Sequence, residues 1–257
     1  MQKVYSFIKG FSLLLLASCS CGSDHRNGTY TIAADISWYG TDFMGQQNNV
    51  TGFSRDLLKE IGKNKKMKLS FLASNADVLL TDLKENRYNG ALTALYPYIF
   101  NLSTFDFSKP YLLTGPVLVL PVSSTLTALD QLGGKEIAVL AGSNADLVVE
   151  KNPGILIRPY DSIPQALNDI IAGAVDGAVV DVIIASSYSQ NLFEGQLKIA
   201  SPPLNEQGLR LIASNSRAQP LINAFNQGLD ELKKSGAYET LLKKWSLGQG
   251  PLKAASP

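Results

Sequence analysis

The chain has 257 residues, 45% of them hydrophobic, and a formal net charge of +1 without any block of like charges, which argues against a nucleic-acid-binding surface. Its two cysteines, Cys19 and Cys21, and its one histidine, His25, all lie near the N-terminus. The rest of the chain therefore offers no Cys or His for a metal site or a nucleophile–histidine pair, and it contains no glycine-rich phosphate loop. No cofactor is expected, and an enzyme would have to rely on carboxylate, Lys or Tyr chemistry.

The first 18 residues have the pattern of a secretory signal peptide. Lys3 and Lys9 give a positive start, and Phe11–Ala17 is a short apolar core. This apolar run is too short for a spanning helix, which needs ~20 apolar residues. We therefore exclude residues 1–18 from the expected fold.

The leader ends in Leu16-Ala17-Ser18-Cys19, which resembles a bacterial lipobox, the pattern in which the Cys thiol is lipidated and becomes the new N-terminus. The alternative is an ordinary signal peptide with an incidental Cys19. The lipobox interpretation predicts a lipid anchor at Cys19 without a membrane span, a tether over residues 19–26, and a location in the periplasm or cell envelope.

Strand and helix patterns alternate along the rest of the chain. Short apolar runs predict strands at Tyr30–Ala34, Lys68–Leu72, Gly90–Leu95, Pro116–Pro121, Glu136–Ala141, Ile155–Arg158, Ala178–Val182, Leu197–Ala200 and Leu209–Ala213. Helical spacing of apolar residues or capping residues predicts helices around Phe53–Ile61, Asn75–Leu83, Asn144–Glu150, Ile163–Ala172, Ile183–Gln190, Leu221–Leu229 and Tyr238–Trp245. This alternation predicts an α/β fold with mainly parallel sheets.

One short pattern occurs twice. A helix, an Asn89-Gly90 turn and a buried strand are matched later by a helix, an Asp176-Gly177 turn and a buried strand, which suggests two similar α/β lobes. Ligands of open α/β sheets bind at the carboxyl ends of strands. The strand ends that could line one shared cleft are Asp35, Ala94–Tyr96, Ala141–Ser143 and Asp181.

Five segments carry a family resemblance, and they stand in the family's order. They are Thr51–Leu58 (TGFSRDLL), Phe105–Tyr111 (FDFSKPY), Leu129–Gly142 (LDQLGGKEIAVLAG), Tyr160–Asp181 and Leu232–Trp245 (LKKSGAYETLLKKW). They resemble motifs of family 3 solute-binding proteins, the substrate-capturing subunits of polar amino acid ABC importers. The resemblance implies a small polar solute and ABC permease subunits as partners, a monomer, and no catalytic activity.

The resemblance also implies a type II periplasmic-binding-protein fold, in which two α/β lobes joined by two hinge strands close over the solute. Lobe one would comprise residues 27–113 and 207–247, and lobe two residues 114–206. The crossings would lie near Leu113–Pro116 and Leu204–Gly208, and residues 248–257 would form a tail.

Five positions match ligand-binding positions of that family. Asp35 would contact the ligand's ammonium or side chain, Trp38 would stack on the ligand, and Tyr96 and Ser143 would bind a carboxylate. Asp181 would pair with the α-ammonium group. The alternatives are a helix or turn cap for Asp35, a core role for Trp38 and an ordinary helix N-cap for Ser143.

Asn101 departs from the family pattern, because it stands where the family has the arginine that pairs with the ligand's α-carboxylate. No Arg or Lys lies between Gly90 and Ser108. Asn101 remains a candidate ligand contact, and Arg210 could supply the cation from another wall or could lie on the surface. A ligand without a free α-carboxylate, such as a peptide, amide or amine, and a neutral polar solute are therefore alternatives.

Two other functions use the same fold. One is a periplasmic dehydratase-like enzyme, for which Asp35 and Asp181 would be the candidate acid and base. The other is a lipoprotein that senses a ligand and signals to a partner.

Overall fold

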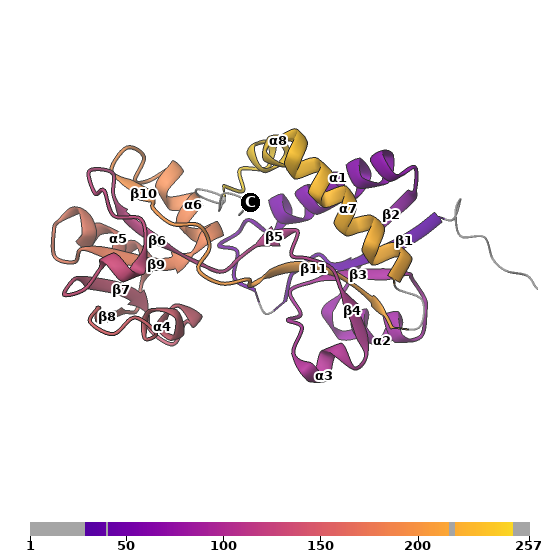
Figure 1. The fold of residues 1–257 in the computed structure, drawn as a ribbon, viewed down its shortest axis with the longest axis horizontal. Helices are drawn as coiled ribbons and strands as arrows, with labels where there is room; N and C mark the ends of the chain where they lie inside the picture. The colour runs from indigo at the N-terminus through magenta and orange to yellow at the C-terminus, as the bar shows by residue number, and fades with distance from the viewer. Residues whose placement is uncertain (1–28, 40, 216–218, 249–257) are drawn as a thin grey trace, which may run out of the picture.

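The computed structural model describes residues 29–39, 41–215 and 219–248 as two lobes, each built on its own sheet (Figure 1). Lobe 1 is the part built on a six-stranded sheet, and lobe 2 the part built on a five-stranded sheet. The predicted signal peptide, Cys19, the tether over residues 19–26 and the tail beyond Gly248 lie outside the described residues.

The lobe 1 sheet has the order β2-β1-β3-β11-β4, and β5 also pairs with β11. Its strands are β1 (Thr29–Asp35), β2 (Lys68–Ser74), β3 (Gly90–Thr93), β4 (Phe105–Phe107), β5 (Leu112–Leu113) and β11 (Gly208–Ser214). In Figure 1, three helices lie above this sheet: α1 (Gln47–Lys65), α7 (Gln219–Ser235) and α8 (Ala237–Lys244). Below it lie α2 (Ala76–Lys84) and the short α3 (Ile99–Leu102).

The lobe 2 sheet has the order β10-β6-β9-β7-β8. Its strands are β6 (Pro116–Pro121), β7 (Glu136–Leu140), β8 (Leu156–Tyr160), β9 (Gly177–Asp181) and β10 (Leu197–Ile199). The helices of this lobe are a 3₁₀ turn η2 (Leu129–Gln131), α4 (Asn144–Val149), α5 (Ile163–Ile171) and α6 (Val182–Gln190).

The expectation of mainly parallel sheets was wrong, because both sheets are mixed. β1 pairs in parallel with β2 and β3, and β7 with β8 and β9, whereas β11 is antiparallel to β3, β4 and β5, and β6 is antiparallel to β9 and β10. The reason lies in the connections. β6 and β11 start where the chain enters a lobe and run away from the boundary between the lobes, while β3 and β9 run toward it.

An aromatic cluster fixes the helices of lobe 1 on the sheet. Phe53 of α1 stacks on Tyr111 at a centroid distance of 6.4 Å, and Phe225 of α7 and Tyr238 of α8 meet this pair edge-on. The Tyr238 hydroxyl donates to the Tyr111 carbonyl at 2.7 Å, and the Tyr111 hydroxyl lies 2.9 Å from Ser54 Oγ. Tyr111 precedes β5 directly, so this cluster also fixes the start of the first crossing.

The chain crosses between the sheets twice, from β5 to β6 and from β10 to β11, and main-chain hydrogen bonds join the crossings. The amides of Thr114 and Gly115 both donate to the Gln207 carbonyl, at 2.9 and 3.2 Å, and the Leu204 amide donates to the Pro116 carbonyl at 2.8 Å. The two crossings therefore form one hydrogen-bonded hinge segment.

Glycines allow the crossings to approach this closely. A Cβ added at Gly208 would lie 2.5 Å from the Leu112 carbonyl oxygen, and one added at Gly115 would lie 2.0 Å from Asn205 Oδ1. Since the contact of Gly208 is with backbone, a side chain there would force the two strands apart.

The segment after α8 makes a further contact between the lobes. Leu247 is fully buried, and a Cβ added at Gly248 would lie 2.3 Å from Ser186 Oγ and 2.6 Å from Gln190 Nε2, both on α6. In Figure 1 this contact lies above the crossings, whereas α3 and α4 lie below them.

Candidate functional site: a cleft between the lobes

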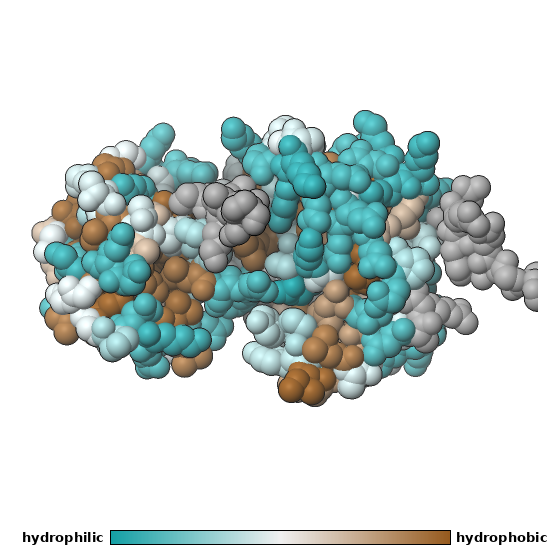
Figure 2. Space-filling model, viewed as in Figure 1, coloured by the Kyte–Doolittle hydropathy of each residue, from teal (hydrophilic) through white to brown (hydrophobic). Residues whose placement is uncertain are grey.

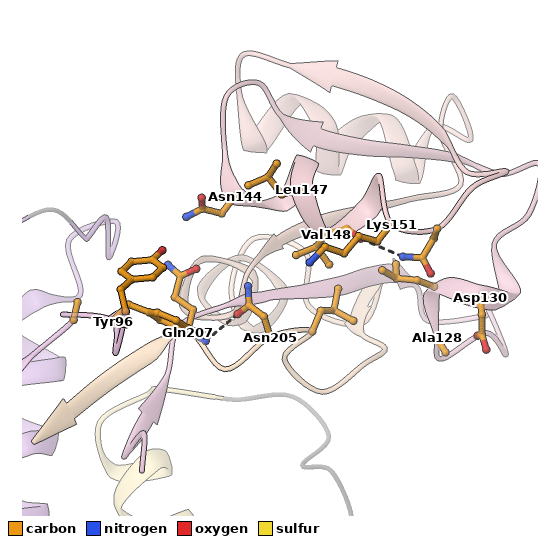
Figure 3. Close-up of a pocket in the computed structure, with 14 residues that line it drawn as sticks. Tyr96, Ala128, Asp130, Asn144, Leu147, Val148, Lys151, Asn205 and Gln207 are labelled. Carbon is orange, nitrogen blue, oxygen red and sulfur yellow. Dashed lines mark hydrogen bonds between the residues drawn. The ribbon is translucent and has the colours of Figure 1, made fainter. Parts of the chain in front are cut away.

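A cavity of about 780 Å³ lies at the crossings, with walls from both lobes (Figure 3). Lobe 1 contributes Ala94, Tyr96 and Tyr98. The facing wall and the floor contain Ala128, Leu129, Asp130, Asn144, Leu147, Val148, Lys151, Asn152, Leu204, Asn205 and Gln207. The cavity is open to solvent, because Tyr96 on one wall is 39% exposed and Leu147 on the other is 60% exposed.

A ladder of aromatic rings extends the lobe 1 wall. The Tyr96 and Tyr98 ring centroids lie 4.9 Å apart, and Phe100 stacks on Tyr98 at 5.5 Å. Figure 2 shows the apolar tip of lobe 1 at this place, and Ile99 there is 88% exposed. Asn101 Nδ2 donates to the Tyr96 carbonyl at 2.7 Å, so the observed role of Asn101 is to hold the loop that carries Tyr96.

Helix α4 forms the facing wall. Ser143 is its N-cap, with Oγ accepting from the Ala145 amide at 3.3 Å, which agrees with the N-cap alternative. The cap fixes the helix so that Asn144 and Leu147 lie on the cavity side (Figure 3). Ser143 itself does not line the cavity, and its role as a carboxylate ligand stays a prediction.

Asp35 and Trp38 line a separate cavity of about 100 Å³ in lobe 1. The Asp35 carboxylate accepts three hydrogen bonds within its own turn, from Ser37 N at 3.0 Å, Ser37 Oγ at 2.7 Å and Tyr39 N at 2.8 Å. Trp38 is 3% exposed, packs edge-on against Phe43 and donates from Nε1 to Thr51. Both residues therefore have structural roles here, and the ligand contacts expected of them stay predictions.

Asp181 ends β9 at the boundary between the lobes, opposite Pro116 in the sheet. Its side chain makes no ion pair or hydrogen bond with any described residue. Burial raises the pKa of the Asp181 carboxyl to about 6, and the negative charge of Asp42 from lobe 1 acts in the same direction. A cation beside Asp181 would stabilise its ionised form, so Asp181 is chemically suited to pair with an ammonium group.

Arg210 on β11 is 5% exposed, which excludes a surface position for it. Its Nη1 donates to the Ser108 carbonyl at 3.2 Å, and its Nη2 donates to the Glu206 carbonyl at 2.8 Å. Its Cζ lies 5.9 Å from the centroid of the Tyr96 ring, so the guanidinium is next to a residue that lines the cavity. Burial lowers the pKa of Arg210, against the opposing effects of Glu206 and Tyr96.

Of the residues predicted to bind ligand, the large cavity thus includes only Tyr96, while Asn101, Ser143 and Asp181 line neither cavity among the described residues. Leu147, Lys151, Asn205 and Gln207 line the large cavity but were not predicted. The sequence held some indication of them, because Asn205 and Gln207 fall in the expected second crossing. An apolar Leu147 on the outer side of a short helix was the other indication.

Within the described ranges, no three His, Cys, Asp or Glu side chains are grouped to hold a metal ion. None of the described helices is both long and apolar enough to cross a membrane.

A family model described as bacterial extracellular solute-binding proteins, family 3, matches residues 30–249. The chain belongs to this family. The match includes both lobes and both crossings, which confirms the resemblance drawn from the sequence motifs.

Curated relatives cover nearly the same length. The chain is 24% identical over 250 residues to a probable histidine-binding protein of Campylobacter jejuni, an alignment that covers 94% of this chain and 97% of the relative. It is also 24% identical over 225 residues to the L-cystine-binding protein TcyJ of Escherichia coli, covering 86% of this chain and 83% of the relative.

Solved structures confirm the two-lobed fold. The L-cystine solute receptor of Neisseria gonorrhoeae, in its unliganded open conformation, aligns with a TM-score of 0.67 and 20% identity over 89% of this chain and 98% of the receptor. An ancestral cyclohexadienyl dehydratase aligns with a TM-score of 0.65 and 19% identity, covering 85% of this chain and 92% of the dehydratase. The fold by itself therefore does not separate binding from catalysis.

Proposed function

We propose that this protein captures an amino acid in the cleft between its lobes and delivers it to the permease subunits of an ABC importer. The observation that supports this most directly is the family match over residues 30–249, combined with a solvent-open cavity whose walls come from both lobes. The named binding partners of the relatives, histidine and L-cystine, are amino acids.

The proposed mechanism is closure without catalysis. An amino acid held by Tyr96 on one wall and by α4 on the other contacts both lobes only when they approach. The ligand therefore shifts the population toward a closed arrangement, with movement at the hydrogen-bonded crossings. The permease would read this closed arrangement, in which the solute is enclosed.

A ligand screen by thermal unfolding tests the proposal. The twenty standard amino acids, L-cystine, dipeptides and polyamines are added singly to the purified protein. Since a ligand that binds only the folded state stabilises it, an amino acid at 100 times its dissociation constant should raise the unfolding free energy by ~2.7 kcal/mol. If no amino acid has an effect while a dipeptide or polyamine does, amino acid capture is refuted. Turnover of a bound compound would instead favour a dehydratase-like enzyme.

We further propose that the protein is anchored in the cell envelope by a lipid on Cys19. The support is the Leu16–Cys19 lipobox pattern. Replacing Cys19 by Ser should move the protein from the membrane pellet to the soluble fraction and abolish incorporation of labelled palmitate. Cys21→Ser is the matched control and should leave both unchanged. A Cys19→Ser protein that stays in the membrane fraction would contradict the anchor.

A further inference from the structure

The guanidinium of Arg210 is a buried charge without a counter-ion in contact. The ion pairs among the described residues do not include it, and the only carboxylate that acts on it is the exposed Glu206, from beyond ion-pair distance. Burying a charge is unfavourable unless it is paired and hydrogen-bonded. The present contacts of Arg210 satisfy this only in part.

The guanidinium also keeps unused donors. Arginine has five N–H groups in a fixed fork, a geometry that suits a carboxylate. Backbone carbonyls of Ser108 and Glu206 accept from the two terminal nitrogens, whereas Nε of Arg210 is buried and has no hydrogen-bond partner. A buried unpaired donor on a cation marks a place where an anion would be favourable.

Arg210 is placed to meet the cavity. In the sheet, Arg210 lies opposite Thr93, and the residue after Thr93, Ala94, lines the cavity. Glu206, whose carbonyl accepts from Arg210, lies in the sequence between the lining residues Asn205 and Gln207. The Tyr96 ring, which lines the cavity, lies against the guanidinium, with 5.9 Å between its centroid and Cζ. Figure 3 shows the Tyr96 phenol directed into the cavity beside Gln207.

We propose that Arg210 binds the carboxylate of the amino acid, with the Tyr96 hydroxyl as a second donor, at the hinge end of the cleft. A carboxylate that enters past the Tyr96 ring would pair with the guanidinium and accept from Nε. The ligand class is then a free α-amino acid, not an amide, an ester or the corresponding amine. This inference rests on the proposed function and assigns the charge-bearing residue of its site.

Lys151 is the other cation of the cavity, and it provides the control. It is exposed on the lobe 2 wall, where solvent screens its charge. A carboxylate there would gain little, whereas the contact with buried Arg210 is protected from solvent. Arg210→Met and Lys151→Met each remove one positive charge from the surroundings of the cleft, so they form a matched pair.

The experiment measures carboxylate recognition by calorimetric titration of the full-length protein. The probes are L-histidine with histamine and L-cystine with cystamine, and any other amino acid that stabilises the protein with its own decarboxylated amine. In the wild type, each amino acid should bind more tightly than its amine. Arg210→Met should weaken the amino acids roughly 10- to 100-fold and leave the amines unchanged, because one charge-assisted contact is lost. Lys151→Met should keep the wild-type ratio.

Arg210→Met also removes the side-chain donors to the Ser108 and Glu206 carbonyls, the first of which is a buried contact, so folding is checked by circular dichroism. Arg210→Lys keeps the charge but not the fork, and it should give an intermediate ratio that can be measured if the Met variant does not fold. Equal binding of amino acid and amine by the wild type, or an unchanged ratio in both Arg210 variants, would overturn the proposal while amino acid capture stands. If no amino acid or amine binds the wild type, the proposed function fails and this inference fails with it.

Discussion

Asp181 carries a partly buried carboxyl group that forms no ion pair with any described residue. Its pKa is raised to about 6 from 3.8, first by burial and then by the charge of Asp42. A carboxyl whose folded-state pKa lies above its unfolded value binds its proton more tightly in the folded state. Its ionisation therefore lowers stability as pH rises through the interval from about 4 to about 6.

Replacing Asp181 by Asn should remove this pH-dependent loss. The unfolding free energy of the variant relative to the wild type should increase between pH 4 and pH 7 by on the order of 2 kcal/mol, because the neutral amide carries no desolvated charge. Urea unfolding at several pH values measures it. A relative stability that stays constant across this range would contradict the raised pKa.

Asp176 is a control for Asp181, because its pKa is shifted in the opposite direction. Burial alone would raise its pKa, but the hydrogen bonds from Lys135 and the Glu136 amide and the charge of Lys135 lower it overall. Ionised Asp176 therefore stabilises the fold, and this contribution is lost as pH falls below about 4. Asp176→Asn should lower stability at pH 7, with the difference from wild type shrinking in acid.

Ligand affinity should also depend on the protonation state of the Asp181 carboxyl, if the ligand's ammonium group pairs with it as predicted from the family. Amino acid binding should then weaken as pH falls below about 6, because protonation neutralises the partner. Calorimetric titration between pH 5 and pH 8 measures this profile. Asp181→Asn should bind weakly at all these pH values, and a variant that kept the wild-type pH profile would exclude this role.

At the scale of elements, segments with an apolar run, helical spacing or a capping residue were predictable, and three short elements without such a pattern were not. The expected helix Asn144–Glu150 is α4, Asn144–Val149, and the expected strand Leu209–Ala213 lies within β11. The four-residue α3, the three-residue β4 and the two-residue β5 were missed. Elements of this length show no periodicity, and pairing with β11 or a local turn determines them.

The candidate site was less predictable than the fold, for two physical reasons. Motif positions show where a strand ends but not which partners a side chain contacts. Asp35 was therefore predicted to contact the ligand, although its carboxylate accepts hydrogen bonds from Ser37 and Tyr39 in its own turn. The cavity also depends on the separation of the lobes, which no local pattern encodes. The sequence therefore does not identify Leu147 and Lys151 as residues that line the cavity, because this depends on the position of the facing wall.

The close approach of β5 and β11 at Gly208 leads to a prediction about the hinge. Gly208→Ala places a Cβ 2.5 Å from the Leu112 carbonyl oxygen, so the strands must shift, at a cost of about 1–3 kcal/mol. Gly133→Ala is the control, because a Cβ at Gly133 meets nothing within 4 Å and should change stability by less than about 1 kcal/mol. Chemical unfolding compares them. Equal stability of the two variants would show that the hinge is looser than described.

At the scale of the whole molecule, α4, which lines the cleft, and α3, which begins next to the lining residue Tyr98, lie on one side of the crossings. The contact between the segment after α8 and α6 lies on the other side (Figure 1). The lobe rotation proposed above would therefore separate Gly248 from Ser186 and Gln190 on α6. If the lobes close as proposed, this contact forms only in the open arrangement, and a bulky side chain inserted there would act as a wedge that favours closure.

Gly248→Leu should accordingly tighten amino acid binding, although it is remote from the cleft. A shift of about 1 kcal/mol in the open–closed equilibrium changes the apparent dissociation constant about fivefold while the open state dominates. Small-angle scattering should show a more compact unliganded protein. Gly133→Leu, with open space at its Cβ, should change neither quantity. Weaker binding by Gly248→Leu would refute the wedge.

Hydrogen–deuterium exchange of the backbone amides in the hinge segment offers a direct measure of lobe movement. The amides of Thr114 and Gly115 both donate to the Gln207 carbonyl, and the Val182 amide donates to the Gly115 carbonyl, so these protons lie at the crossings that join the lobes. Amide protons exchange with deuterium only when such bonds open. Deuterium uptake over residues 113–116, recorded by mass spectrometry without an attached dye, therefore reports how often the hydrogen bonds of the hinge segment open. A bound amino acid that restricts lobe movement should slow this uptake.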